Sequence, residues 1–234
     1  PLPDGPFDLV LCSNVLNELH ADAGGDPLVP RLELVRAVLA RVLAPDGALV
    51  VLEPALREPA RVLHRLRDAI AAEATVFAPC VRKASCPMLA NERDWCHEER
   101  PLLLPERTRL VARLSGVRRE SLKFSYLTLR KDGRTLHDAV AGAQLRAQFR
   151  VVSTLLGSKG RDEIFVCGEP GRLRVLRNRR DRSDTNDSFD TLDRGTLVSF
   201  SPALDPERPR VDAESRVDSW DPLAASAVDE EDGE

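Results

Sequence analysis

The sequence lacks several patterns that would place the protein in a familiar class. No apolar run approaches the roughly 18 residues that a membrane-spanning helix needs, and no signal-peptide pattern opens the chain. There is no Walker loop, catalytic triad or paired-carboxylate signature. The odd total of five cysteines argues against a disulfide framework. We therefore expect a cytoplasmic protein with neither a membrane nor a disulfide partner.

Lysine is scarce, whereas arginine is abundant. Lysine occurs only at positions 83, 123, 131 and 159, although Lys and Arg together number 34. From Ala203 onward there are 11 acidic residues and 3 arginines, which leaves the preceding part of the chain at +4. Guanidinium groups bind phosphates through paired hydrogen bonds and stack on bases, so the bias is compatible with an RNA partner. A GC-rich genome that favours arginine codons would produce the same bias.

The cysteines that are present suit a metal centre. Structural zinc sites usually show tight C-x2–4-C knuckles, and no such knuckle joins the four main candidates, Cys80, Cys86, Cys96 and Cys167. A [4Fe-4S] cluster takes one thiolate on each iron and accepts ligands from well-separated loops. A zinc site that includes His97 is the alternative, although adjacent side chains of an extended chain point in opposite directions. The fifth cysteine, Cys12, is predicted to be a small core residue.

Several short motifs follow one another in a particular order. They are DLVLCSNVLNEL, LVVLEP, A-P-C, C-P-M, D-W-C-H, K-F-S-Y and V-C-G-E-P-G-R-L. Over about residues 7 to 182 the chain thereby resembles the ribosomal small-subunit methyltransferase-like family, which includes a mitochondrial ribosome-assembly factor and bacterial relatives. The resemblance implies that the four matching cysteines hold a [4Fe-4S] cluster and that the fold is that of class I S-adenosylmethionine (SAM) methyltransferases. The sequence departs from the family pattern at Val81-Arg82, where Pro-His is common, and at Glu98, where an aromatic residue is common.

The order of apolar and polar segments predicts an α/β fold that changes to antiparallel β. A strand over Phe7–Cys12, a helix over Pro30–Leu43, a turn at 44–47 and a strand over Ala48–Leu52 form a β-α-β unit typical of a parallel sheet. A helix over Pro59–Ala74 precedes the cysteine-bearing segment, which is predicted to be a loop. Downstream we expect a helix over Leu103–Leu114, then strands over Leu122–Arg130, Phe149–Thr154, Glu163–Cys167 and Arg172–Arg177, the last two as a hairpin.

These expectations divide the chain into four regions. They are a partial Rossmann-like methyltransferase core at 1–78, a cysteine-ligated cluster region at 79–182, a terminal strand region at 183–202 and a disordered acidic tail at 203–234. A class I methyltransferase holds SAM with a glycine-rich turn after its first strand and an acidic residue after its second. Neither occurs here, the first strand resembles the family's fourth, and the chain begins with Pro. We therefore expect the C-terminal half of a class I sheet, with a Cys-rich metal-binding insertion and an antiparallel β extension. SAM is then a cofactor whose site is incomplete in this chain.

Two further groups of residues are candidates for binding. Ser13, Asn14 and Glu53 lie at the ends of neighbouring strands, and in the class I fold this edge faces the cofactor. They are predicted to contact SAM, with a helix cap and a solvated strand end as the alternatives. An RNA-phosphate surface is predicted beside the fourth cysteine, although a solvated hairpin would also explain its residues, Arg172, Arg174, Arg177 and Arg179. No chemical role is predicted for three of the histidines, His20, His64 and His137.

The leading hypothesis is a SAM-methyltransferase-like protein that binds the small ribosomal subunit or its rRNA, carries a [4Fe-4S] cluster, and serves ribosome assembly and translation. Whether it transfers methyl groups is a separate question, because the residues that would hold SAM lie outside this sequence. One alternative is a non-catalytic assembly factor in which the cluster is a structural clamp or a sensor of iron supply. Another is a structural zinc module without redox chemistry.

Overall fold

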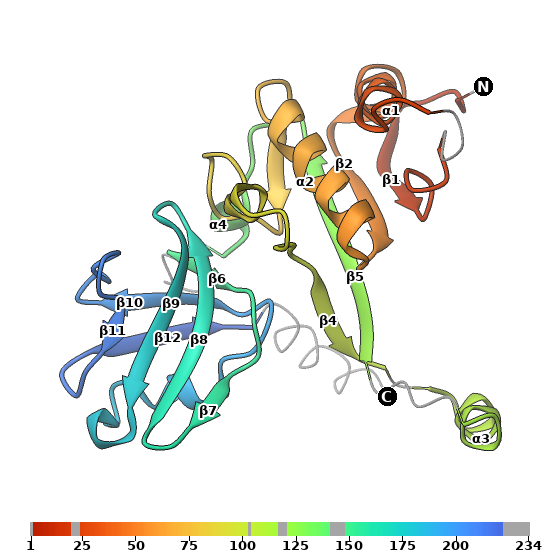
Figure 1. Ribbon diagram of the computed structural model, residues 1–234. Helices are drawn as coiled ribbons and strands as arrows, with labels where there is room; N and C mark the ends of the chain where they lie inside the picture. Colours follow the sequence, from red (N-terminus) through yellow and green to blue (C-terminus); the bar gives the residue numbers. More distant parts are fainter. Residues whose placement is uncertain (1, 20–23, 103, 117–120, 141–147, 222–234) are drawn as a thin grey trace, which may run out of the picture.

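The computed structural model describes residues 2–19, 24–102, 104–116, 121–140 and 148–221. These residues form two β-sheets, each with its own cluster of buried apolar side chains (Figure 1). The first sheet has five strands, and the second has seven strands and is curled. Within the described ranges, no helix combines the length and the apolar character needed to cross a membrane.

The predicted β-α-β unit is confirmed. β1 (Phe7–Ser13) and β2 (Leu43–Pro54) pair in parallel, and α1 (Leu28–Arg41) connects them. β2 begins earlier than predicted, because the expected turn at 44–47 is an irregularity inside the strand. This irregularity shifts the register between two paired positions of β1 and β2, Phe7 with Leu43 and Leu9 with Ala48.

The remaining pairs of the first sheet are antiparallel, so the sheet is mixed. β5 (Ser121–Arg130) lies beside β2, and its other edge pairs with β3 (Thr75–Ala78) and β4 (Glu98–Pro101). α3 (Glu106–Leu114) connects β4 to β5, and Leu103, where this helix was expected to begin, lies outside the described residues. Because β3 and β4 flank the cysteine-bearing segment, both ends of that segment are held against the same strand.

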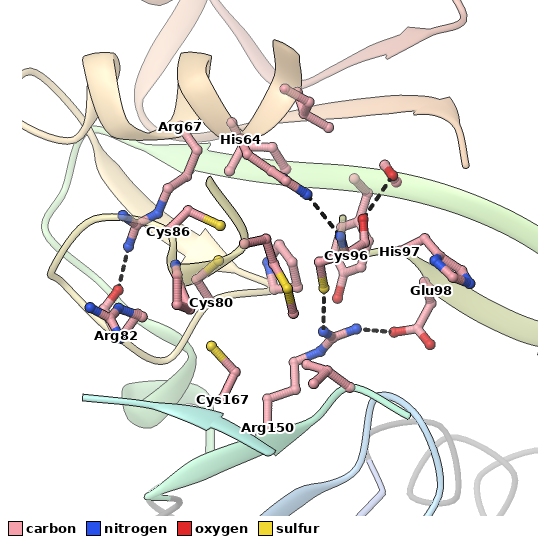
Figure 2. A pocket seen from close by; sticks show the side chains of 18 of the residues that line it. His64, Arg67, Cys80, Arg82, Cys86, Cys96, His97, Glu98, Arg150 and Cys167 are labelled. Atoms are coloured by element: carbon pink, nitrogen blue, oxygen red, sulfur yellow. Dashed lines mark hydrogen bonds and ion pairs between the residues drawn. The ribbon is translucent and has the colours of Figure 1, made fainter. Parts of the chain in front are cut away.

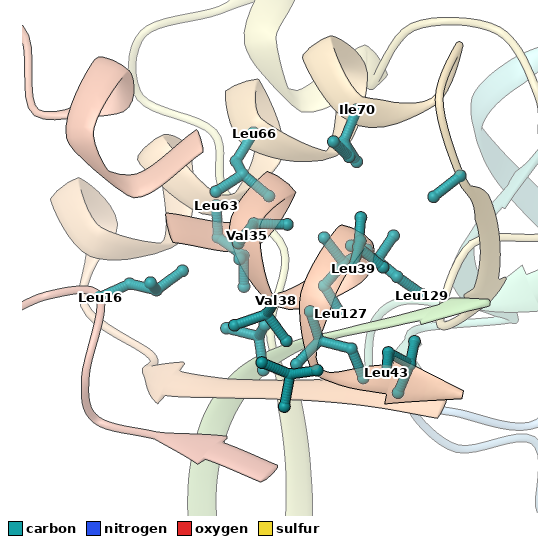
Figure 3. Close-up of a cluster of buried hydrophobic side chains, with 14 residues drawn as sticks. Leu16, Val35, Val38, Leu39, Leu43, Leu63, Leu66, Ile70, Leu127 and Leu129 are labelled. Carbon is teal, nitrogen blue, oxygen red and sulfur yellow. The ribbon is translucent and has the colours of Figure 1, made fainter. Parts of the chain in front are cut away.

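The core of the first sheet lies on one face, under α1 and α2 (Arg57–Ile70), as Figure 3 shows. Leu49 and Val51 of β2 point into this core and are completely buried. Alternate residues of a strand face opposite sides of the sheet, so the next residues face away from the helices. In the edge strand β1, Leu9 and Leu11 are 64% and 60% exposed. The described helices therefore cover one face of this sheet and leave apolar residues at its β1 edge uncovered.

The second sheet contains the predicted hairpin, formed by β8 (Arg161–Gly168) and β9 (Gly171–Asn178). Gly168 allows the hairpin to approach the preceding chain closely, because a Cβ there would collide with the Gln148 carbonyl and the Phe149 ring. The strand order is β11-β9-β8-β6-β10-β12, and β7 also pairs with β8. The other strands are β6 (Phe149–Val151), β7 (Leu156–Ser158), β10 (Leu197–Ser201), β11 (Arg210–Val211) and β12 (Arg216–Trp220).

The region from residue 203, predicted to be a disordered tail, is ordered as far as Asp221. β12 pairs antiparallel with β10, and β11 pairs in parallel with β9. The prediction was wrong here because single apolar residues, Val211 and Val217, complete the second core although acidic residues surround them. Residues 222–234 lie outside the described part of the chain. The region 79–182, expected to form one unit, contributes strands to both sheets.

Candidate metal centre

Four cysteines line one cavity where the two sheets meet (Figure 2). Cys80 follows β3, Cys86 precedes a short 3-10 helix (Pro87–Ala90), and Cys96 precedes β4. Cys167 comes from β8 in the second sheet. The structure therefore brings together all four cysteines that the sequence singled out, and all four are free thiols.

The cavity between the thiols has a volume of about 50 Å³. A single water needs roughly 10–15 Å³, so the cavity can hold a group larger than one water. Among the residues that the structure describes, no group of three or more His, Cys, Asp or Glu side chains is arranged to hold a metal ion. The four cysteines share the lining of this cavity.

One face of α2 organises the cysteine-bearing loop. Arg61 donates hydrogen bonds to three backbone carbonyls of this loop, at 2.7 to 2.9 Å. The carboxylate of Asp68 accepts the backbone N–H of Cys86 at 3.0 Å. Nε2 of His64 accepts the backbone N–H of Cys96 at 2.9 Å, and burial lowers the pKa of His64 to about 4. The neutral imidazole is thus the form that positions Cys96.

Two further arginines hold this loop, Arg67 to α2 and Arg82 to the second sheet. Arg67 of α2 is buried and donates to the carbonyls of Arg82 and Ala84, at 2.5 and 2.8 Å. Arg82 in turn donates to the carbonyl of Gly168 at 3.0 Å, directly after Cys167. The Glu169 carboxylate accepts the Lys83 backbone N–H at 2.8 Å. These contacts hold the hairpin of the second sheet against the loop that carries the other three cysteines.

Burial favours the protonated form of three of the four thiols, those of Cys80, Cys86 and Cys167. Burial raises the pKa of Cys86 and of Cys167 to about 12, and it also raises the pKa of Cys80. The positive charge of Arg67 opposes this effect at Cys80, and that of Arg82 opposes it at Cys167. A metal that binds here must therefore displace protons, which makes its affinity depend on pH.

Two aromatic side chains flank Cys96 in the chain. His97 lines the cavity, its ring stacks on Trp95 with centroids 6.4 Å apart, and its buried Nδ1 has no hydrogen-bond partner among the described residues. Trp95 is 38% exposed and donates its indole N–H to the carbonyl of Ala55 at 3.1 Å. This hydrogen bond therefore fixes the loop to the residue that follows β2.

The three residues predicted to contact SAM meet at one edge of the first sheet. Ser13 ends β1, and Asn14 follows it in a left-handed conformation with φ of 54°. Glu53 is only 2% exposed, and its carboxylate accepts the backbone N–H groups of Leu16 and Asn17 at 2.9 and 3.1 Å. Burial raises the pKa of Glu53, and these two hydrogen bonds oppose the rise. Glu53 thus fixes the turn that follows β1.

The four arginines of the predicted RNA surface have different environments. Arg172 pairs with Asp94 at 2.8 Å, and Arg174 donates to Glu163 at 2.7 Å. The side chains of Arg174 and Arg179 are 54% and 57% exposed. Arg177 is completely buried between the carboxylates of Asp162 and Asp190, over the ring of Phe189. The described fold leaves Arg174 and Arg179 accessible to a partner and Arg177 inaccessible.

Sequence reasoning missed the polar face of α2. It assigned no role to His64, because this histidine has no acidic or nucleophilic partner at a recognisable spacing. A usable signal was present, since Arg61, His64 and Asp68 recur at helical spacing and share one face. That face points toward the cysteine loop rather than into the apolar core.

The protein combines a mixed sheet, covered by helices on one face, with a curled and largely antiparallel sheet. The two meet at a thiol-lined cavity, and this combination defines the structural class. The chain belongs to the Rsm22 family, because the family model described as "Mitochondrial small ribosomal subunit Rsm22" matches residues 2–184. This match confirms the resemblance read from the order of the cysteine motifs, and its range includes all four cysteines of the cavity. A comparison with curated proteins found no match.

Proposed function

We propose that this protein is a methyltransferase-like factor that binds the small ribosomal subunit or its rRNA during ribosome assembly. We propose further that a [4Fe-4S] cluster is held by Cys80, Cys86, Cys96 and Cys167. One observation carries the proposal: the range matched by the family model, 2–184, contains four cysteines that line a single buried cavity. The words "small ribosomal subunit" in the family description support the choice of this subunit as the partner.

The residues around the cavity fit a cluster. Its thiolates need positive charge nearby, and Arg67, Arg82 and Arg150 supply it to the cysteines. Single zinc ions draw their thiolates to bonds of about 2.3 Å, whereas a cluster places one iron at each thiolate. Cysteines that come from a long loop and from a separate sheet favour the second arrangement. When bound, the cluster would supply a one-electron redox centre and a link between the two sheets.

Protein purified without oxygen is expected to be brown, to absorb broadly near roughly 400 nm, and to contain about four iron atoms per chain. Iron, zinc and acid-labile sulfide should be measured on the same sample as the visible spectrum. One tightly bound zinc per chain without iron would instead support the structural zinc module.

We also propose that the first sheet is the C-terminal part of a class I methyltransferase sheet, with Ser13, Asn14 and Glu53 at its cofactor edge. The exposure of Leu9 and Leu11 supports this, because apolar residues of a parallel edge strand are normally covered by further strands or helices. Methyl transfer is tested by incubating the protein with small ribosomal subunits and isotope-labelled SAM. Label that appears in rRNA supports an enzyme.

A non-catalytic clamp is the second candidate, and one observation favours it. Three of the cysteines belong to the loop between β3 and β4, whereas Cys167 belongs to the second sheet. A group bound by all four would therefore fix the two sheets to each other without taking part in a reaction. This candidate predicts that iron-free protein loses its affinity for small subunits while both sheets stay folded.

We propose that the exposed arginines of the hairpin contact rRNA phosphates. Replacing Arg174 and Arg179 with Ala is expected to weaken binding to small-subunit rRNA, because phosphate contacts release counterions. The slope of log affinity against log salt should flatten by roughly 0.7 to 0.9 for each lost contact. Arg177 is left intact in this variant because it is buried.

The matched control for rRNA binding is Arg36→Ala. Arg36 is also exposed and paired with a carboxylate, that of Glu73, but it belongs to α1 in the first sheet. Its replacement should leave affinity and salt slope unchanged. If the Arg174/Arg179 double variant binds like the control, these two arginines face solvent and do not contact rRNA.

A further inference from the structure

Arg150 connects the cysteines of the two sheets. It lies in β6, where its backbone pairs directly with Cys167 of β8. Its side chain crosses the cavity, and Nη1 lies 3.8 Å from Sγ of Cys96 (Figure 2). Arg150 is 4% exposed, so water does not screen this contact appreciably. One side chain thus contacts a cysteine of the loop while its backbone neighbours the cysteine of the hairpin.

The same guanidinium is shared with a buried carboxylate. Nη2 of Arg150 lies 2.5 Å from Oε2 of Glu98, a residue that is only 2% exposed. Arg100 approaches the same oxygen at 3.4 Å. A turn of the second sheet closes over this group: Gly195 has φ of 93°, and a Cβ there would lie 2.8 Å from Oε2 of Glu98. The pair is therefore enclosed by both sheets.

The Arg150–Glu98 pair differs from the other arginines near the cavity in the groups that its guanidinium contacts. Arg67 and Arg82 use their guanidinium groups largely on backbone carbonyls, which they hold in place. Arg150 instead places its charge between a cysteine sulfur and a carboxylate. In a buried site, removing either member changes the charge felt by the sulfurs with little compensation from water.

We propose that Arg150 and Glu98 set the charge balance of the cysteine site and hence its reduction potential, with Arg150 also holding Cys96 in position. This inference rests on the proposed cluster. Net charge and hydrogen bonds to the sulfurs are among the properties that set the potential of thiolate-bound iron. Arg150 stabilises the more negative, reduced state, and Glu98 offsets part of that effect. No bond to the protein forms or breaks, since one electron enters from a one-electron donor.

The test uses the full chain, loaded and purified without oxygen, and a titration with dithionite followed by visible absorbance. Arg150→Met should shift the midpoint potential to more negative values, and Glu98→Gln should shift it to more positive values. The double variant should lie between the two. Because residues that orient metal ligands typically matter for affinity, Arg150→Met should also lower iron affinity by roughly 10-fold.

Arg172→Met is the matched control. Arg172 is the other backbone neighbour of Cys167, in β9, but its side chain pairs with Asp94 and is 35% exposed. Its replacement removes the same charge from the other strand beside Cys167, yet should shift the potential less than Arg150→Met does, because the Arg172 side chain is partly exposed. Arg150→Lys keeps the charge without the planar fork, so it should retain the potential better than Arg150→Met.

The outcomes separate this inference from the proposed function. Opposite shifts in Arg150→Met and Glu98→Gln support it. If wild-type protein carries the cluster and both variants share its potential, the charge-balance inference is overturned and the cluster stands. If Arg150→Met does not fold or load, the sign of the Glu98→Gln shift decides alone. Wild-type protein without iron overturns the proposed cluster and the inference together.

Discussion

Cys167→Ser is expected to abolish iron binding and to loosen the β8–β9 hairpin, although most of the second core stays intact. The reason is that Cys167 is the ligand from the second sheet, so its loss removes the link to the loop that carries Cys80, Cys86 and Cys96. A crosslink that closes so long a loop lowers the conformational entropy of the unfolded chain, which stabilises the folded state by about 4 kcal/mol. Iron content and hydrogen exchange of residues 161–178 measure the two effects.

Cys12→Ser is the control for this prediction. Cys12 packs against the core of the first sheet, and burial raises the pKa of its thiol. Its replacement should cost a little stability and leave the iron content unchanged. Loss of iron in Cys12→Ser, or full iron in Cys167→Ser, would contradict the assignment of the four ligands.

Arg177→Met is expected to destabilise the second sheet by about 3 kcal/mol, because removing one partner of a buried ion pair leaves the other charge uncompensated. Arg177 lies 3.6 Å from the carboxylate of Asp162, which is itself buried, and donates to the carbonyl of Asn186 at 2.8 Å. The exposed Arg179 and Arg182 also approach Asp162, at 3.7 and 3.5 Å. Because these two arginines still offset part of the Asp162 charge, the expected loss of stability lies near the lower end of the usual range for a broken buried ion pair. Urea unfolding measures it.

Arg174→Met is the matched control, since Arg174 lies on the same strand and points to the opposite face. Its ion pair with Glu163 is exposed on the arginine side, and such pairs contribute roughly 0 to 1 kcal/mol. Equal free energies of unfolding for the two variants would show that burial does not distinguish these arginines. A larger loss for Arg177→Met would confirm its structural role and justify its exclusion from the RNA surface.

Local patterns were sufficient for much of the fold. The β-α-β unit was predictable because an apolar strand, a helical period and a second apolar strand are all local signals. The hairpin at 168–171 was predictable from its glycines and proline. The tail was not, because β12 is held by its pairing with β10, and β12 itself has only two apolar residues, Val217 and Trp220. Pairing between distant segments depends on the whole fold rather than on either segment.

The sequence by itself determined the identity of the four cysteines and the family to which their order points, since both depend on residue type and spacing alone. Only the tertiary structure decided which side chains surround them. It placed the polar face of α2 under the loop, and it brought Arg150 and Glu98 together between the two sheets. It also buried Arg177 while leaving Arg174 exposed. The physical reason is that burial and charge pairing arise from segments distant in the chain, which no local pattern specifies.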